Sequence, residues 1–391
     1  MDPFTHTLVG LTAAKAGLDR LSPLATTVCM LAANSPDADV VVGFVSDRWD
    51  YLHHHRGITH SIVGVIALAF IVPAIIWAGE RSFARLRHRQ SRTRLRGLLL
   101  ASLLVTATHP LMDWTNNYGV RPLLPWSGRW FYGDMVFIVD PYILLLIGGA
   151  AFLATRRGWP KMVLWALLAT AFVALTFLVA SRPDPGLAGI NIARVVLLVG
   201  VVGLILVRVL KFSRGRERMI AAGALAGLVV YWGVLGFMHR AAHKDASDVA
   251  THAAGTINER ILRVAAMPTL ANPLRWSCVA ETDRAIYRFI IKLADSTEGP
   301  PRIVDGYQTD SPEAIERYEK PTGRAAELSA LAGEDRRAKI LLDFARFPIA
   351  RVQNENCVSQ TIVQIADLRY TEPGVTRGTF SLNVPVECAS K

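Results

Sequence analysis

Long apolar runs before about residue 240 constrain this sequence more than any other feature. A helix needs about 20 apolar residues to cross the hydrocarbon core of a bilayer. Stretches that meet or nearly meet this length are residues 61–79, 136–155, 162–180, 190–210 and 219–238. The chain is 51% hydrophobic and only 19% charged, and its charged residues gather between these runs and in the C-terminal part. The sequence therefore predicts a multi-pass membrane protein with a soluble C-terminal region.

Further apolar segments raise the expected number of membrane helices. Residues 97–112 are apolar up to His109, and residues 7–17 and 21–34 could pair as a helical hairpin with Asp19-Arg20 at its tip. We expect an α-helical integral membrane domain of six to eight helices over residues 1–239. Residues 240–391 are numerous enough to bury a core of their own, so we expect a second domain there.

Basic residues between the apolar runs predict the orientation. They concentrate in residues 81–96, 156–161 and 211–218. Two predicted spans separate each pair of these segments, so all three are expected on the same, cytoplasmic side. The last span then leads outward. We therefore expect a bacterial inner membrane protein whose C-terminal domain is extracytoplasmic, where disulfides are permitted. Cys357 and Cys388 are one candidate pair.

The formal net charge of +11 could also indicate nucleic-acid binding. Loops that orient a membrane protein explain the same charge, because its arginines and lysines lie in short segments between apolar runs. We therefore expect the lipid bilayer, and no nucleic acid, as a partner. The sequence does not indicate an oligomeric state.

On this topology, polar residues from well-separated segments meet at the outer face. They are His6, Asp37, Asp39, His55, His60, His109, Asp113, Asp134 and Asp140. Ionisable groups at membrane depth are costly and usually functional. Imidazole nitrogens and carboxylate oxygens are also the ligands that zinc and similar divalent ions prefer. The pattern predicts a metal or polar catalytic site at this face.

Spacing supports some of these residues more than others. His109 and Asp113 are four apart and share a helix face, although Pro110 between them can bend or end the helix. His55 and His60 are five apart and converge only if Gly57 turns the chain, with Thr59 as a candidate helix cap. Each residue also has a structural explanation: a buried hydrogen-bonded pair, an exposed histidine, or an aspartate that begins or ends a helix.

The C-terminal region shows an α+β pattern. Residues 285–293, 302–308, 358–370 and 379–386 have strand-like alternation or β-branched content, whereas residues 239–265, 311–333 and 334–347 resemble helices. An antiparallel sheet packed with helices is the expected fold. No nucleotide-binding loop and no Gly-x-Ser-x-Gly sequence occurs in this region.

The N-terminal motifs together resemble the YdjM-like family of predicted membrane-bound metal-dependent hydrolases. The similar segments are residues 1–8 (MDPFTHTL), 35–39 (SPDAD), 55–61 (HRGITHS), 109–119 (HPLMDWTNNYG), 131–134 (FYGD) and 138–141 (IVDP). They cover about the first 145 residues. The resemblance implies a helical membrane domain distantly related to zinc-dependent phospholipase C-like enzymes, and it implies no particular substrate.

Two functions are consistent with the sequence. The first is a hydrolase that uses a divalent metal, zinc by preference, on a phospholipid or other phosphodiester at the outer face. The expected metal ligands are His6, His55, His60, His109 and Asp113, and the expected catalytic residues are Asp37, Asp39 and Arg56, the arginine facing an anionic phosphate. The second is a non-catalytic membrane scaffold or transporter whose polar cluster binds an ion.

Overall fold

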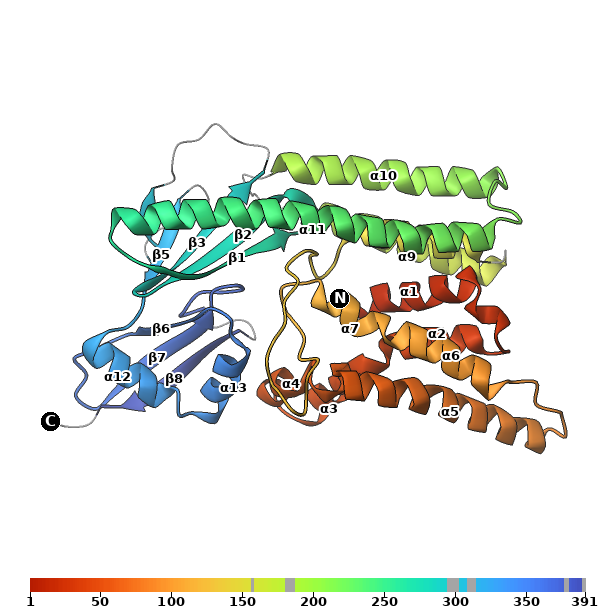
Figure 1. The fold of residues 1–391 in the computed structure, drawn as a ribbon, viewed down its shortest axis with the longest axis horizontal. Coiled ribbons are helices and arrows are strands. Elements are labelled where there is room, and N and C mark those ends of the chain that lie inside the picture. Colours follow the sequence, from red (N-terminus) through yellow and green to blue (C-terminus); the bar gives the residue numbers. More distant parts are fainter. Residues whose placement is uncertain (156–157, 180–186, 294–301, 308–313, 376–379, 389–391) are drawn as a thin grey trace. The chain divides into compact units, whose positions relative to one another are not determined.

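The computed structural model describes residues 1–155, 158–179, 187–293, 302–307, 314–375 and 380–388. These residues form two compact units (Figure 1). The first contains Met1–Ala38, Arg56–Met238 and Pro268–Pro273, and the second contains Asp39–His55, His239–Met267 and Leu274–Lys391.

The first unit is helical, as the apolar runs predict. Its chain begins with the expected hairpin, in which α1 (Pro3–Ala16) and α2 (Ala25–Asn34) are joined through the short 3-10 helix η1 (Leu18–Arg20). The 3-10 helix η2 (Ser35–Val41) follows and continues into the second unit. The remaining helices are η3 (Ile58–His60), α5 (Ile62–Leu86), α6 (Leu95–Thr106), α7 (Thr108–Trp114), α8 (Pro141–Ala154), α9 (Trp159–Val179), α10 (Leu187–Val209) and α11 (Glu217–Thr256). Helix α11 continues into the second unit after Met238.

Within the described residues, 4 helical segments are long and apolar enough to cross a membrane, and two shorter apolar helices accompany them. The longer segments are Ala25–Val45, Ile62–Leu86, Leu95–Trp114 and Glu217–Thr256, and the shorter ones are Pro141–Ala154 and Trp159–Ala174. Helix α5 leaves large apolar side chains exposed, with Ile66 at 48% and Ile75 at 63%. Such a surface suits contact with lipid. The expected number of six to eight spans is not confirmed.

Close helix packing in the first unit depends on glycine. A Cβ atom on Gly10 of α1 would lie 2.5 Å from the carbonyl oxygen of Cys29 on α2. A Cβ atom on Gly97 of α6 would lie 2.3 Å from the carbonyl oxygen of Leu21. The hairpin and α6 therefore approach each other backbone to backbone, as small residues allow in membrane helix bundles.

The second unit contains two sheets and several helices. The five-stranded sheet has the order β1-β2-β3-β5-β4 and the three-stranded sheet has the order β6-β7-β8. The strands are β1 (Ile261–Thr269), β2 (Asn272–Thr282), β3 (Ala285–Lys292), β4 (Ile303–Asp305), β5 (Ile315–Glu319), β6 (Pro348–Val352), β7 (Gln360–Asp367) and β8 (Ser381–Glu387), and the helices are α3 (Val42–Val45), α4 (Arg48–His54), α12 (Gly323–Ala332) and α13 (Arg336–Phe344).

A shared core holds the two sheets of this unit together. Met267, Ile286 and Tyr318 of the larger sheet belong to the same buried cluster as Ile349 and Ala366 of the smaller one. The strand pairs described between neighbours are antiparallel except for β4 and β5, which are parallel. A C-terminal sheet-containing domain is therefore confirmed, and the expected antiparallel pairing holds for the described pairs other than β4 with β5.

Several expected elements differ from the structure. Residues 239–265 are not one helix, because α11 ends at Thr256 and β1 begins at Ile261. Residues 311–333 are not one helix either: β5 occupies Ile315–Glu319 and pairs in register with β3, and only Gly323–Ala332 is helical. Alternation within five residues is too short to outweigh the helical pattern that follows it, so sheet pairing decides this segment. Residues 308–313 lie outside the described part.

Candidate metal centre

The α1–α2 hairpin and two short helices build one polar cluster in the first unit. Asp37 follows the C-terminal end of α2, His60 ends η3, and His109 and Asp113 lie on α7. Helix α7 is separate from α6, and its start at Thr108 leaves Pro110 in the first turn, where a missing N–H breaks no helical hydrogen bond. His109 and Asp113 therefore keep their i,i+4 relation, and the anticipated distortion by Pro110 does not separate them.

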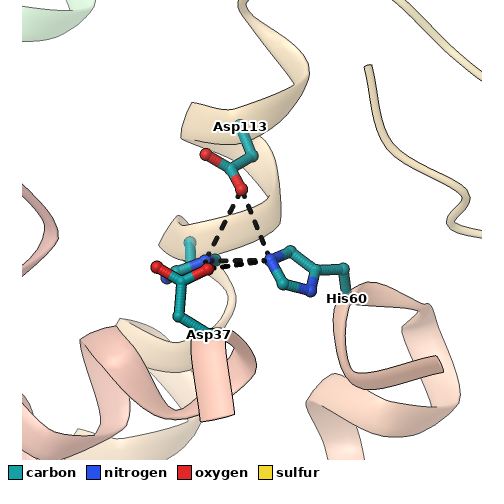
Figure 2. Close-up of side chains that lie close together, drawn as sticks. Asp37, His60 and Asp113 are labelled. Carbon is teal, nitrogen blue, oxygen red and sulfur yellow. Dashed lines mark hydrogen bonds and ion pairs between the residues drawn. The ribbon is translucent and has the colours of Figure 1, made fainter. Parts of the chain in front are cut away.

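The polar atoms of these four residues face a common point (Figure 2). The Nε2 atom of His60 lies 3.4 Å from Asp37 Oδ1 and 3.4 Å from Asp113 Oδ2. The Nε2 atom of His109 lies 3.3 Å from Asp37 Oδ1 and 3.6 Å from Asp113 Oδ2. The two Nε2 atoms are 3.1 Å apart. One ligand atom from each residue thus lies within 4.8 Å of every other.

These separations match a tetrahedral ion. Ligands bound to zinc at about 2.0–2.1 Å in a tetrahedron are about 3.3–3.4 Å from one another. The five distances given above range from 3.1 to 3.6 Å. The donor set of two imidazoles and two carboxylates is also one that zinc accepts. The four residues therefore fit a divalent ion of this size.

Hydrogen bonds behind the histidines set which nitrogen can bind an ion. The Nδ1 atom of His109 lies 2.6 Å from the carbonyl oxygen of Ala33, which can only accept, so Nδ1 donates its proton there. The Nδ1 atom of His60 lies 3.1 Å from the hydroxyl of Thr59. When the proton of each neutral imidazole is on Nδ1, the lone pair of each Nε2 atom faces the cluster. Thr59 thus orients His60, whereas the cap of α5 is Ser61 and not Thr59 as expected.

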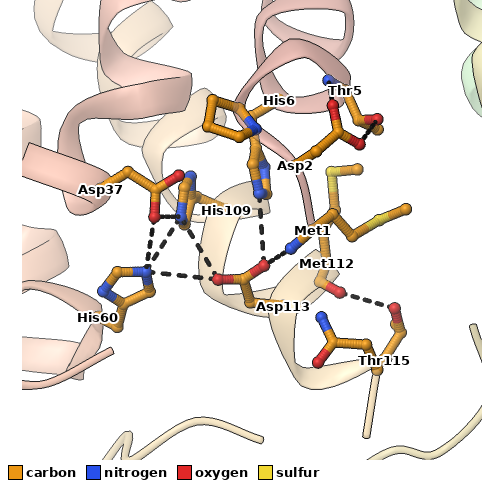
Figure 3. Close-up of polar contacts among 12 residues, drawn as sticks. Met1, Asp2, Thr5, His6, Asp37, His60, His109, Met112, Asp113 and Thr115 are labelled. Atoms are coloured by element: carbon orange, nitrogen blue, oxygen red, sulfur yellow. Dashed lines mark hydrogen bonds and ion pairs between the residues drawn. The ribbon is translucent and has the colours of Figure 1, made fainter. Parts of the chain in front are cut away.

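The second oxygen of Asp113 faces away from the four-residue cluster (Figure 3). Its Oδ1 atom lies 3.4 Å from Nε2 of His6 and contacts the amino group of Met1. The His6 ring stacks on His109, with ring centroids 3.7 Å apart. His6 is 1% exposed, and neither of its ring nitrogens has a hydrogen-bond partner within the described residues. His6 therefore adjoins the cluster and contacts Asp113 from the side opposite to His60.

Arg56 holds Asp113 and the segment behind it. Its Nε atom lies 3.1 Å from Asp113 Oδ2, and its Nη1 atom donates to the side chain of Asn116 at 2.9 Å and to the carbonyl oxygen of Gly119 at 3.1 Å. Its guanidinium also lies 4.5 Å from the centre of the Tyr118 ring. Arg56 is buried, and its φ of 54° lies in the left-handed region.

Asp39 and His55 belong to the second unit. The Nδ1 atom of His55 lies 3.1 Å from Asp39 Oδ1, so these two expected site residues pair with each other. Asp140 has a structural position in the first unit. Its Oδ1 atom caps α8 by accepting from the backbone N–H groups of Tyr142 and Ile143, as expected for the start of a span.

The sequence did not assign two groups that contribute to the cluster. Asn116 accepts from both Arg56 and the backbone N–H of Tyr118, and the carbonyl of Ala33 orients His109. Asn116 lies in the motif of residues 109–119, but no role for it was predicted from the sequence. A backbone carbonyl carries no residue-type signal, so the role of Ala33 had no signal in the sequence.

Comparisons with known proteins bear on the N-terminal part of the chain. Residues 1–183 match the family model described as YdjM inner membrane protein. This region of the chain is similar to the YdjM family. The resemblance seen in the sequence motifs is thereby confirmed, and all four cluster residues lie within the YdjM region.

Two curated relatives are similar to part of the chain. The uncharacterized protein YfhP of Bacillus subtilis is 30% identical over 155 residues, which cover 37% of this chain and 43% of YfhP. The inner membrane protein YbcI of Escherichia coli is 34% identical over 119 residues, which cover 29% of this chain and 62% of YbcI. The chain thus spans less than two thirds of either relative. No solved structure matches. Family and apolar helices together indicate a membrane protein.

Proposed function

We propose that the YdjM region is a metal-dependent hydrolase that acts at the outer face of a bacterial inner membrane. The single observation that carries this proposal is the near-tetrahedral arrangement of Asp37, His60, His109 and Asp113. With the His109 proton on Nδ1, its Nε2 lone pair faces Asp37 Oδ1 at 3.3 Å. Two electron-rich atoms this close require a cation between them. A proton could supply it, but five similar separations favour a metal ion.

The four side chains of the cluster differ in their exposure to solvent, and this difference suggests different roles for them. The side chains of His60 and His109 are 0% exposed and that of Asp113 is 1% exposed, whereas that of Asp37 is 15% exposed. We assign His60, His109 and Asp113 as the residues that would hold the ion. Two histidines and one carboxylate with a further open position form a ligand set that catalytic zinc sites use. Asp37 stands on the accessible side, where a carboxylate can bind the ion or accept a proton from water.

When bound, a divalent ion at this position lowers the pKa of a water and polarises a phosphoryl or acyl oxygen. The surrounding residues position the ligands. Arg56 fixes Oδ2 of Asp113, His6 faces Oδ1, and Ala33 and Thr59 fix the imidazoles. A phospholipid or other phosphodiester is the proposed substrate, because the site lies at the ends of apolar helices, where head groups lie. The expected role of Arg56 at a phosphate stays a prediction.

A second candidate function is favoured by the position of Asp37, whose carboxylate lies as close to the two imidazoles as that of Asp113 does. If Asp37 also binds the ion permanently, four protein ligands close the coordination sphere, as in structural zinc sites. The ion would then join α2, η3 and α7 within a non-catalytic membrane protein.

Metal analysis of the purified full-length protein tests both candidates. We expect about one divalent ion per chain in the wild type and loss of that ion in His60→Ala and His109→Ala. His252→Ala is the matched control, since His252 lies on the exposed surface of α11. Hydrolysis of a phospholipid or phosphodiester that stops with chelator and in both variants supports the enzyme. A stoichiometric ion without turnover supports the structural site, and a wild type without metal contradicts both.

Orientation is a separate part of the proposal. In the first unit, the arginine-rich segment after α5 contacts the hairpin tip, where the backbone N–H of Arg94 donates to Ser22 Oγ at 2.8 Å. His6 and the tip lie toward opposite ends of α1, so the metal centre and the basic loops lie toward opposite faces. The disulfide between Cys357 and Cys388 suits an oxidising compartment. We therefore propose that the C-terminal domain is extracytoplasmic and that the basic loops are cytoplasmic.

A further inference from the structure

A basic pocket lies at the end of the first unit away from the metal centre. It has a volume of ≈ 760 Å³ and is formed by η1 with the end of α1, the C-terminal ends of α8 and α10, and the loop that leads into α11. Its basic residues are Lys15, Arg20, Arg208, Lys211, Arg214 and Arg218, and its acidic residues are Asp19 and Glu217. The proposed hydrolase makes no use of this pocket.

Most of this positive charge is not neutralised by the protein. Lys15 faces Asp19 at 3.4 Å. In the described part of the chain, Arg20, Lys211, Arg214 and Arg218 form no ion pair with a carboxylate. Concave clusters of one sign of charge concentrate the field inside them and attract counter-ions. The pocket is therefore built to receive an anion.

One wall of the pocket is fixed by Arg208. This residue is 8% exposed, and its guanidinium donates to the carbonyl oxygens of Phe152 at 2.8 Å, Leu153 at 2.9 Å and Thr155 at 2.6 Å. These carbonyls end α8 and carry its negative dipole end, so Arg208 both caps the helix and offsets that charge. Arg208 thereby removes the repulsion that the C-terminal end of α8 would exert on an anion in the pocket.

The position of the pocket at the ends of apolar helices favours a lipid over a soluble anion as its ligand. The apolar helices α8 and α10 end at its rim and α11 begins there, and Leu153 and Ala154 contribute apolar lining. Lipid head groups lie at this depth, and basic pockets between membrane helices bind anionic head groups. We propose that this basic pocket binds the phosphate group of an anionic phospholipid, with the acyl chains along the neighbouring apolar helices.

Lipid titration of the full-length protein tests the proposal. Native mass spectrometry in detergent would measure the affinity for phosphatidylglycerol and for zwitterionic phosphatidylcholine. We expect tighter binding of phosphatidylglycerol by the wild type. Arg214→Gln combined with Arg218→Gln should weaken it about 30-fold, because each charge near the head group contributes about fivefold. The matched control is Arg216→Gln with Arg87→Gln, whose guanidinium groups lie over the Phe212 and Phe83 rings and outside the pocket.

Three results would overturn the proposal. The first is equal binding of the two lipids by the wild type, and the second is equal loss in the pocket variant and the control. The third is displacement of phosphatidylglycerol by inorganic phosphate but not by chloride at equal ionic strength, which would assign the pocket to a soluble anion. The thermal midpoint of each variant, measured in the same detergent, distinguishes loss of the pocket from loss of the fold.

Discussion

At the scale of single residues, Asp113 connects the cluster to its surroundings. One carboxylate oxygen faces His60 and His109, and Arg56 approaches the same oxygen at 3.1 Å. Arg56 reaches this position because it adopts a left-handed backbone conformation directly before Gly57. Groups that orient metal ligands commonly change metal affinity 10- to 100-fold when they are removed.

Arg56→Gln should therefore weaken zinc binding by about 10- to 100-fold without abolishing it. The glutamine removes the contact with Asp113 but no proposed ligand. A competition titration against a chromophoric chelator measures the change. Arg129→Gln, at an exposed arginine that lies over the Phe131 ring, should leave the affinity unaltered. Unchanged affinity in the Arg56 variant would remove this residue from the centre.

Asp37 and Asp113 should respond differently to the same change. Asp113→Asn should lose the ion, because it alters a buried proposed ligand. Asp37→Asn should keep most of the ion but lose turnover, because Asp37 is the exposed member of the cluster. Metal content and hydrolysis rate, measured on the same samples, separate the two effects. Loss of the ion from both variants would instead favour the closed structural site.

At the scale of elements, close helix contacts hold the cluster in place. His6 on α1 and Asp37 after α2 keep their positions only if the two helices stay close. Gly10 permits this approach, since the carbonyl oxygen of Cys29 occupies the space beside it. Gly79 on α5 has nothing within 4 Å of its would-be Cβ atom. The two glycines thus provide a comparison within one bundle.

Gly10→Ala should destabilise the membrane domain by about 1–3 kcal/mol, because a Cβ atom must push α1 away from α2. Gly79→Ala should be neutral or stabilising by up to about 1 kcal/mol, since alanine favours the helix and meets no neighbour. Thermal unfolding in detergent measures both. Similar midpoints for the two variants would show that α1 and α2 are not packed this closely.

At the scale of the whole molecule, the basic loops and the disulfide are the two features that bear on the proposed orientation. The apolar spans permit either direction through a bilayer, and loop charge selects between them. The Cys357–Cys388 disulfide joins positions 31 residues apart in the second unit. Such a link typically contributes about 2–4 kcal/mol and persists only where thiols are not kept reduced.

Reporter fusions should read this orientation directly. Alkaline phosphatase, which is active only outside the cytoplasm, should be active when fused at Lys391 and inactive when fused at Gln90. A fluorescent protein that folds only inside should give the reverse pattern. Activity at Gln90 together with inactivity at Lys391 would invert the topology and place the metal centre on the cytoplasmic side.

The sequence alone determined the membrane class, the hairpin at the start, the sheet-containing C-terminal domain and the YdjM resemblance. These depend on local signals: apolar length, charge between spans, and short motifs such as His109-Pro110 and Ser35-Pro36. It also selected His60, His109 and Asp113, because imidazole and carboxylate at an apolar boundary carry a strong chemical signal.

Only the tertiary structure decided which of these residues meet. It paired His55 with Asp39, placed Arg56 against Asp113, and supplied the Ala33 carbonyl next to His109. It also turned residues 315–319 from helix to strand by pairing them with β3. The physical reason is the same in each case: these outcomes depend on contacts between distant segments, and local composition does not encode the separation of two side chains.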